Sequence, residues 1–201
     1  MLIGVGLGPG DPELLTLKAI NVLQFAEKVF VPGKISYELV HPYADAEILE
    51  FPMTENKVKL KDAWISNVNI IAQFATTGIA AFAVIGDPNI FSTFSHLRKM
   101  LNKLRPDIIV ETVPGVSAIT SFTSRVNAPI DATFIVSDGS SIMSKVILKA
   151  KKPQKLADEL IAEGYKKIVL IERAFTEKER VYRDNFPEYC NYFSIMYGKK
   201  I

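Results

Sequence analysis

The stretch MLIGVGLGPGDPELLTLKAINVL, residues 1–23, decides the fold class of this chain. Its first seven residues are mostly apolar and predict a short buried strand. Apolar side chains then recur at close to helical period, which predicts a helix within residues 12–27. A strand that leads through a glycine-rich turn directly into a helix is the start of an α/β fold.

The glycines of this turn do not match the fingerprint of a dinucleotide-binding loop. That fingerprint needs glycine at its first, third and sixth positions, so that the backbone can approach a pyrophosphate. Counted from Gly4 or Gly6, the sixth position holds Pro9 or Asp11. Asp11 and Pro12 are typical of an N-cap and a first helical residue, so a carboxylate stands where an anion would bind. A tight turn capped by Asp11 and a loop for a different ligand both remain open.

The rest of the N-terminal half repeats the alternation of strand and helix. The run IAAFAVI, residues 79–85, is continuously apolar, as expected for a central parallel strand covered on both faces. The pattern predicts further strands over residues 28–32, 46–52 and 107–115, and helices over residues 58–77, 91–104 and 117–126.

A second series of elements follows the dipeptide Ala128-Pro129. Strands are predicted over residues 132–138, 145–149 and 166–174, with an amphipathic helix over 151–164 that Gly164 would end. Two alternating stretches, 180–184 and 192–198, are expected to pair antiparallel. We therefore predict an α/β domain with a parallel sheet and glycine-rich turns over 1–129, and an α/β domain with a mixed sheet over 130–201.

Composition narrows the classes of function. The formal net charge is +2, which gives no broad field for nucleic acid or an acidic membrane. The basic stretch from Lys145 to Lys155 predicts a solvated face, because no aromatic residue interleaves with it. No apolar run is long enough to span a bilayer. The single cysteine, Cys190, excludes an internal disulfide, and we expect a cytoplasmic protein.

A second acidic turn, Gly86-Asp87-Pro88, follows the predicted central strand, and a small-residue loop over 113–118 follows the next one. In open α/β sheets, ligands bind outside the carboxyl ends of the strands, so these loops and the opening turn are expected to face one crevice. A rim of carboxylates and small residues favours a neutral or cationic ligand over a polyphosphate.

Four segments together make the chain similar to the tetrapyrrole methylases, a family that transfers a methyl group from S-adenosylmethionine. They are GVGLGPGDPELLTLKA (4–19), GDPNIFSTF (86–94), VPGVSAITSFTSRVNAPI (113–130) and IERAFTEKERVY (171–182). Within the family, the segments after Gly86 and Ile171 and the terminal YFSIMYGKK most resemble the methyltransferases that act at C20 of precorrin-2 or cobalt-factor II in cobalamin biosynthesis. Alternatives are a relative acting on uroporphyrinogen III, another corrin carbon or the diphthamide precursor, and a non-catalytic protein that binds S-adenosylmethionine.

The resemblance implies two α/β domains with the active site in the cleft between them, and a homodimer. It implies that the donor, and S-adenosylhomocysteine as product, is held by Gly86, Asp87, Pro88, Ile90, Ser92, Thr93, Ser117, Ala118, Lys149 and Ala174. Lys149 departs from the apolar residue that the siroheme-forming relatives place there, although its backbone still offers a contact. The chain also looks short between Ser137 and Lys145, where a substrate loop is expected to be reduced.

The tetrapyrrole is expected to contact the opening turn and basic side chains. The candidates are Gly8, Pro9, Gly10, Asp11, Arg125 and Arg173, with Lys34 as a further basic residue. We assign no catalytic base and no metal ligand. A reduced tetrapyrrole activates its own meso carbon, and packing or surface roles are expected for His41 and His96. A structural role is likewise expected for Cys190.

Overall fold

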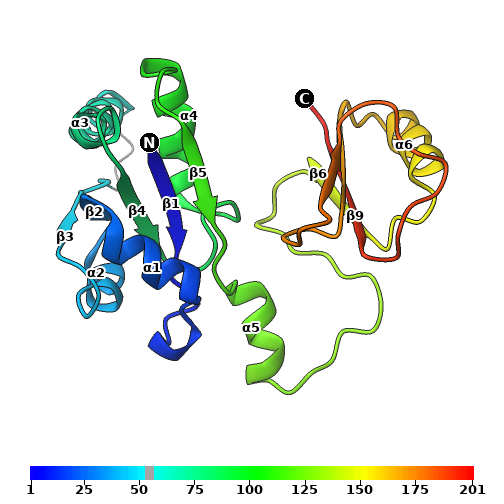
Figure 1. Ribbon diagram of the computed structural model, residues 1–201, viewed down its shortest axis with the longest axis horizontal. Helices are drawn as coiled ribbons and strands as arrows, with labels where there is room; N and C mark the ends of the chain where they lie inside the picture. The colour runs from blue at the N-terminus through cyan, green and yellow to red at the C-terminus, as the bar shows by residue number, and fades with distance from the viewer. Residues whose placement is uncertain (53–56) are drawn as a thin grey trace. The chain divides into compact units, whose positions relative to one another are not determined.

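The computed structural model describes residues 1–52 and 57–201. It forms two compact units, Met1–Phe134 and Ile135–Ile201 (Figure 1). In the described part of the chain, no helix combines the length and the apolar character needed to cross a membrane.

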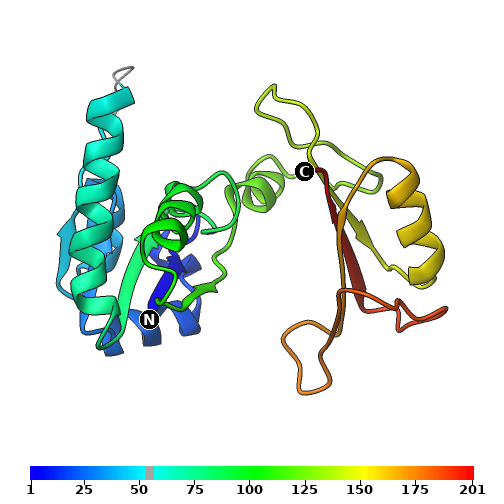
Figure 2. The same cartoon turned by 90° about the horizontal axis from the view of Figure 1, so that it is seen from above.

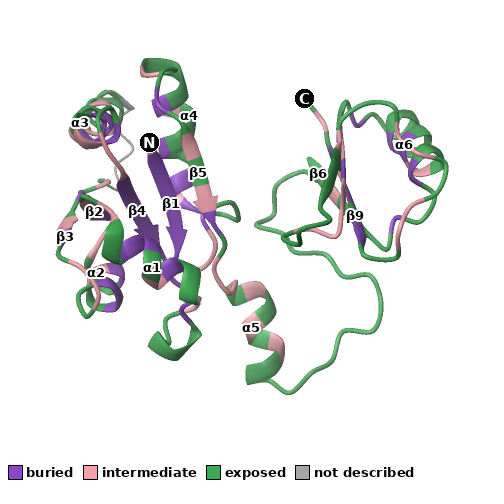
Figure 3. Ribbon diagram, viewed as in Figure 1, coloured by how far each residue is buried: buried purple, intermediate pink, exposed green. Residues whose placement is uncertain are grey.

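A parallel sheet of five strands forms the centre of the first unit. Its order is β3-β2-β4-β1-β5, and every neighbouring pair is parallel. The adjacent strands β4 and β1 are buried along their whole length (Figure 3). This confirms the buried strands predicted from the apolar runs at residues 1–7 and 79–85. The strands are β1 (Leu2–Gly6), β2 (Lys28–Val31), β3 (Ala46–Ile48), β4 (Ala80–Val84) and β5 (Val110–Val113).

Helices cover both faces of this sheet, because successive strand residues point to opposite sides. One core joins residues of α1 (Leu17–Phe25) and α2 (Lys34–Val40) to alternate side chains of β1, β2 and β4. The other core joins α3 (Lys57–Ala75) and α4 (Thr93–Leu104) to the remaining side chains. A further helix, α5 (Ala118–Arg125), follows β5 and buries none of its residues. The unit is therefore a three-layer α/β/α structure.

Gly4 of β1 is required by the packing of α4. A Cβ atom added at Gly4 would lie 2.4 Å from Cε1 of the Phe94 ring, and Phe94 is fully buried. The first glycine of the opening stretch thus serves core packing and needs no ligand to explain it.

The predicted opening helix is divided in two. A short 3₁₀ helix, η1 (Pro12–Leu14), is capped by Asp11, whose Oδ1 accepts from the backbone N–H of Glu13 at 3.0 Å. The helix α1 begins only after Thr16, whose hydroxyl accepts from the N–H of Ala19 at 3.1 Å. Leu15 between them is extended and buried in the core, so Asp11 caps the turn and not the main helix. The helix α2 was not predicted.

The second unit contains a sheet of four strands in the order β6-β9-β7-β8. Every neighbouring pair described in it is antiparallel, so the predicted mixed sheet is wrong. The reason is that the last strand inserts between β6 and β7, which would otherwise be parallel neighbours joined through α6. The elements are β6 (Ser144–Leu148), α6 (Pro153–Ala162), β7 (Lys167–Glu172), β8 (Arg180–Tyr182) and β9 (Ser194–Lys199).

The stretches 180–184 and 192–198, which contain β8 and β9, do not pair with each other, contrary to the prediction, because both pair with β7.

The predicted cap of α6 is confirmed. Gly164 has φ +87°, and the N–H of Tyr165 donates to the carbonyl of Leu160 at 2.9 Å. Figure 2 shows α6 on one face of this sheet. The opposite face carries exposed apolar side chains, among them Val146 and Leu148.

The predicted strand over residues 132–138 is absent. These residues form neither helix nor strand, and no described strand pairs with them. Phe134, Ile135 and Val136 are exposed. A strand depends on a neighbour for its backbone hydrogen bonds, and alternating apolar residues alone do not supply one.

We predict that Gly4→Ala lowers the free energy of unfolding of the first unit by about 1–3 kcal/mol, the usual cost of overpacking. Chemical denaturation measures the loss. The matched control is Gly4→Ala combined with Phe94→Leu, in which the smaller side chain makes room for the methyl group. The double variant is expected to lose less stability than the sum of the two single variants, and strict additivity would contradict the packing argument.

Candidate functional site

Three loops converge at the carboxyl edge of the first sheet, where β4, β1 and β5 end side by side. A Cβ atom added at Gly6 would lie 2.4 Å from the backbone nitrogen of Gly115. One added at Gly115 would lie 2.2 Å from the carbonyl oxygen of Gly86. The three loops therefore lie in contact, close enough that only glycine fits at positions 6 and 115, while the predicted crevice that they would face stays a prediction.

Hydrogen bonds fix the opening turn against the acidic turn. The N–H of Gly86 donates to the carbonyl of Gly8 at 2.7 Å, and the two residues form an isolated antiparallel bridge. Both have positive φ, +78° at Gly8 and +73° at Gly86, a conformation that favours glycine. Beyond Gly8, Pro9 is half-buried and Gly10 is exposed.

Asp87 joins two of the loops through its carboxylate. Its Oδ1 accepts from the N–H of Asn89 at 2.8 Å, within the acidic turn. Its Oδ2 accepts from the N–H of Gly115 at 3.3 Å, in the loop after β5. The Asn89 amide in turn donates to the hydroxyl of Thr112 at 3.1 Å. Asp87 is only partly buried, so its carboxylate organises the loops and still brings a negative charge to their surface.

The two predicted serines begin the helices that follow these loops. The Ser92 hydroxyl accepts from the N–H of Phe94 at 3.1 Å and caps α4. The Ser117 hydroxyl accepts from the N–H of Ile119 at 3.2 Å and caps α5. Thr93 and Ala118 are the first residues of these helices. In the acidic turn, Pro88 is buried and Ile90 is exposed, so Ile90 offers an apolar surface to a ligand.

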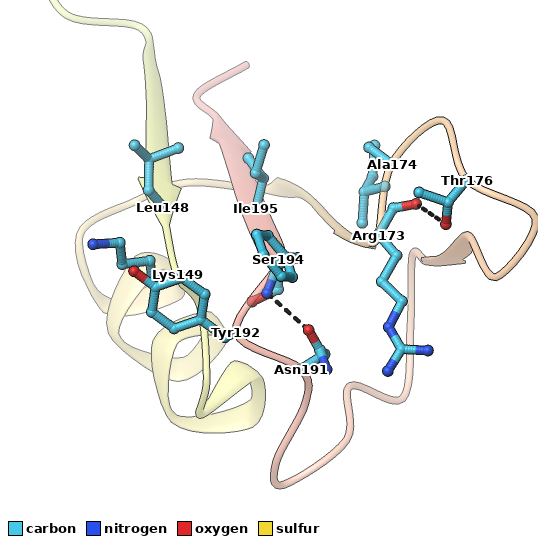
Figure 4. Close-up of a pocket in the computed structure, with 11 residues that line it drawn as sticks. Leu148, Lys149, Arg173, Ala174, Thr176, Asn191, Tyr192, Ser194 and Ile195 are labelled. Carbon is cyan, nitrogen blue, oxygen red and sulfur yellow. Dashed lines mark hydrogen bonds between the residues drawn. The ribbon is translucent and has the colours of Figure 1, made fainter.

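The predicted site residues of the second unit lie around one hollow of about 870 Å³. Lys149 lines it together with the adjacent pair Arg173 and Ala174, which lies more than twenty residues further along the chain (Figure 4). Its other walls come from Leu148, Ile171, Thr176, Asn191, Tyr192, Phe193, Ser194 and Ile195. Sequence reasoning did not assign residues 191–193 to a site, because it placed residues 192 and 193 in the alternating stretch 192–198, of which only the part from Ser194 forms β9.

Glu172 holds that loop in place. One of its carboxylate oxygens accepts from the N–H of Asn191 at 2.6 Å, and the other accepts from the hydroxyl of Tyr182 at 3.3 Å. Cys190, beside it, donates its thiol to the carbonyl of Ala150 at 2.9 Å, and burial raises its pKa. Both residues have structural partners within their own unit, as expected for Cys190.

The remaining basic candidates, Arg125 and Lys34, lie at the ends of helices. Arg125 is the last residue of α5 and is exposed. Lys34 is the first residue of α2, and its Nζ lies 3.6 Å from a carboxylate oxygen of Glu38, an exposed ion pair that contributes little to stability.

The two histidines have aromatic neighbours. His41 stacks on Tyr37, and His96 lies beside Trp64. Among the residues that the structure describes, no group of three or more His, Cys, Asp or Glu is arranged to hold a metal ion.

The family model for Tetrapyrrole (Corrin/Porphyrin) Methylases matches residues 1–189. The chain belongs to this family. The match includes the three converging loops of the first unit and most of the second, and it confirms the resemblance drawn from the glycine-rich turns.

Two relatives carry the name of a C20-methyltransferase that acts on precorrin-2 or cobalt-precorrin-2. A protein of Methanocaldococcus jannaschii named "Probable cobalt-precorrin-2 C(20)-methyltransferase" is 32% identical, over 98% of this chain and 95% of its own length. A "Precorrin-2 C(20)-methyltransferase" of Sinorhizobium is 28% identical, over 78% of this chain and 69% of its own length.

Solved structures support the fold. A uroporphyrin-III-C-methyltransferase from Thermus thermophilus aligns over 99% of this chain and 91% of its own, with a TM-score of 0.51 and 20% identity. A cobalt precorrin-4 methyltransferase aligns over 98% of this chain and 94% of its own, with a TM-score of 0.51 and 17% identity. The tetrapyrrole methylase family thus shares this α/β architecture, as predicted.

We predict that Asp87→Ala lowers the free energy of unfolding by about 1–2 kcal/mol, because two backbone N–H groups lose their acceptor. Asp87→Asn is expected to lose less, since it keeps one side-chain oxygen as an acceptor. Asp131→Ala, in an exposed segment, is the matched control and is expected to change stability by less than about 0.5 kcal/mol. Urea denaturation followed by fluorescence compares the three, and equal stability of Asp87→Ala and Asp131→Ala would contradict the bridging role.

Proposed function

We propose that this protein is an S-adenosylmethionine-dependent methyltransferase that methylates C20 of precorrin-2 or cobalt-factor II in cobalamin biosynthesis. The observation that carries the proposal is the 32% identity to the relative from Methanocaldococcus jannaschii, which extends over nearly the whole of both chains. The second relative carries the name of the same reaction on the metal-free substrate.

The converging loops fit a donor of this kind. A Cβ atom added at Gly86 would meet no atom within 4 Å, so the acidic turn presents bare backbone to open space. The Asp87 carboxylate next to it suits a ligand that carries positive charge. We propose that the donor is held by the residues of this turn and of the helix starts, namely Gly86, Asp87, Pro88, Ile90, Ser92, Thr93, Ser117 and Ala118. When bound, the donor supplies an electrophilic methyl group on a sulfonium.

The task of this chain in such a reaction is to position its two substrates. The ring carbon that accepts the methyl group supplies the electron pair, so the positive charge of the sulfonium passes to the ring, and that carbon then releases its proton to solvent. Because charge is moved and not created, alignment contributes more than new electrostatic stabilisation, and alignment supplies up to about 7–11 kcal/mol in well-oriented systems. The rigid glycine contacts at Gly6 and Gly115 serve this alignment.

For the tetrapyrrole we propose contacts with the opening turn, Gly8 to Asp11, and with Arg125 and Arg173. From the second unit, Lys149 and Ala174 remain predicted donor contacts. We further propose a cytoplasmic homodimer. The free cysteine is consistent with a reducing compartment.

One observation supports uroporphyrinogen III as a second candidate acceptor. A uroporphyrinogen-III C-methyltransferase of Cyanidium caldarium is 30% identical over 63% of this chain. This relative matches only 49% of its own length, so we rank uroporphyrinogen III below precorrin-2 as the acceptor.

The proposal predicts that the protein adds one methyl group to a reduced precorrin-2-type tetrapyrrole when S-adenosylmethionine is present. Mass spectrometry of the product, run in parallel with metal-free and cobalt-loaded substrate, measures the gain and identifies the preferred acceptor. Position-specific NMR of the product with a ¹³C-labelled donor methyl group locates the new carbon. Transfer to a position other than C20 would contradict the proposed specificity. Binding of S-adenosylhomocysteine without any turnover would favour a non-catalytic protein.

A further inference from the structure

Phe91, at the end of the acidic turn, combines a strained backbone with an exposed ring. Its φ is +46°, in the left-handed region that is unfavourable for a residue with a side chain. The residue is 68% exposed, so its ring gains little from packing within the fold. Glycine or asparagine would adopt this backbone at a lower cost. The fold alone therefore gives no reason for an aromatic residue at this position.

The main chain on either side of Phe91 is fixed. Before it, the N–H of Ile90 donates to the carbonyl of Asp87 at 3.2 Å. After it, Ser92 is buried and caps α4 through its hydroxyl. These contacts set the direction in which the Phe91 side chain leaves the main chain, and they maintain its strained backbone. Strain that the surrounding structure maintains in this way is typical of functional sites.

The Phe91 ring has no aromatic or cationic partner within residues 1–52 and 57–201. None of the ring–ring contacts and none of the cation–ring contacts found there includes it. Phe94, three residues further on, is by contrast fully buried and stacks on Phe82. The face of the Phe91 ring is therefore available to a ligand.

The neighbours of Phe91 indicate which kind of ligand suits its ring. Both carboxylate oxygens of Asp87, in the same turn, already accept from backbone N–H groups, so the main contribution of Asp87 to a ligand is negative charge. Ile90 is 44% exposed and adds an apolar surface. Negative charge, an aromatic face and an apolar side chain together suit a cation that has no N–H or O–H group to donate.

A sulfonium is a cation of this kind. Its charge is spread over the carbon groups bonded to sulfur, and it has no hydrogen-bond donor. The face of an aromatic ring attracts such cations through the quadrupole of the ring, as it attracts quaternary ammonium ligands. The same face is the negative side of that quadrupole, so it does not suit a carboxylate. The ring of Phe91 therefore fits the methyl donor at its charged sulfur.

We infer that Phe91 is a specificity-determining residue, whose ring lies against the sulfonium of S-adenosylmethionine and distinguishes the charged donor from its neutral product. This inference rests on the proposed function, and it adds a residue that the family resemblance does not assign to the site. The attraction disappears when the methyl group leaves, because the thioether of S-adenosylhomocysteine is uncharged. The ring therefore favours the replacement of bound product by fresh donor.

Calorimetric titration of the full chain with S-adenosylmethionine and, separately, with S-adenosylhomocysteine tests this inference. Phe91→Leu keeps an apolar side chain and removes the aromatic face. It is expected to weaken binding of S-adenosylmethionine by about three- to tenfold, and to change the affinity for S-adenosylhomocysteine by less than about twofold. Phe91→Tyr keeps the face and is expected to bind both ligands as the unmodified protein does.

The matched control is Phe25→Leu. Phe25 is also exposed, but it is the last residue of α1 and lies just before the start of β2, whereas the acidic turn follows the end of β4. In a parallel sheet these positions belong to opposite edges, so Phe25→Leu is expected to leave both affinities unchanged.

A further variant, Phe91→Asn, separates the ring from the backbone strain. Asparagine tolerates the left-handed conformation. Its Tm, measured by circular dichroism, is therefore expected to stay level or to rise by about 2–4 °C. Its affinity for S-adenosylmethionine is expected to fall as in Phe91→Leu. A fall in Tm would show that the ring supports the fold and would count against a ligand role.

Two binding results would overturn the inference. Equal losses of affinity for both ligands in Phe91→Leu would place the ring against a part that donor and product share, and no loss for either ligand would remove Phe91 from the site. Failure of the proposed function gives a different outcome, in which the preference for donor depends on Phe91 but no tetrapyrrole is methylated. If the unmodified protein binds neither ligand, both proposals fail.

Discussion

The close approach of three backbone segments, at Gly6, Gly86 and Gly115, is the constraint on which the candidate site depends. It allows the loops after β1, β4 and β5 to touch without side chains between them, so that one carboxylate, Asp87, reaches the N–H groups of two loops. With any larger residue at position 6 or 115, these loops would separate. The surface they form is rigid for that reason, and rigidity is what a reaction governed by alignment requires.

Charge is distributed differently in the two units. In the first, acidic side chains cap turns and stay partly exposed at the edge of the sheet. In the second, lysine and arginine side chains without a described carboxylate partner border an apolar hollow. The two units therefore offer opposite charges to a ligand.

The sequence predicts the first unit well because its signals are local. Continuous apolar runs mark the buried strands, and the Gly-Asp-Pro turns mark the ends of β1 and β4. The capping of α1 by Thr16 was missed because the apolar period continues through Leu15, whose extended backbone depends on its place in the core. The second unit is less predictable. Its sheet order depends on β9 pairing with β6 and β7, and its hollow depends on contacts between residues 149–151 and 190–194, which no local pattern reveals.

The insertion of β9 between β6 and β7 has a consequence for biosynthesis. The first sheet contains all of its strands once residue 113 has been made, so it is able to form while the rest of the chain is still on the ribosome. The second sheet cannot form as early, because β6 has its only described partner in β9, residues 194–199. Its pairings span long sequence separations, which slows closure. Until β9 emerges, the edges of β6 and β7 that it will join are unpaired and open to misassociation.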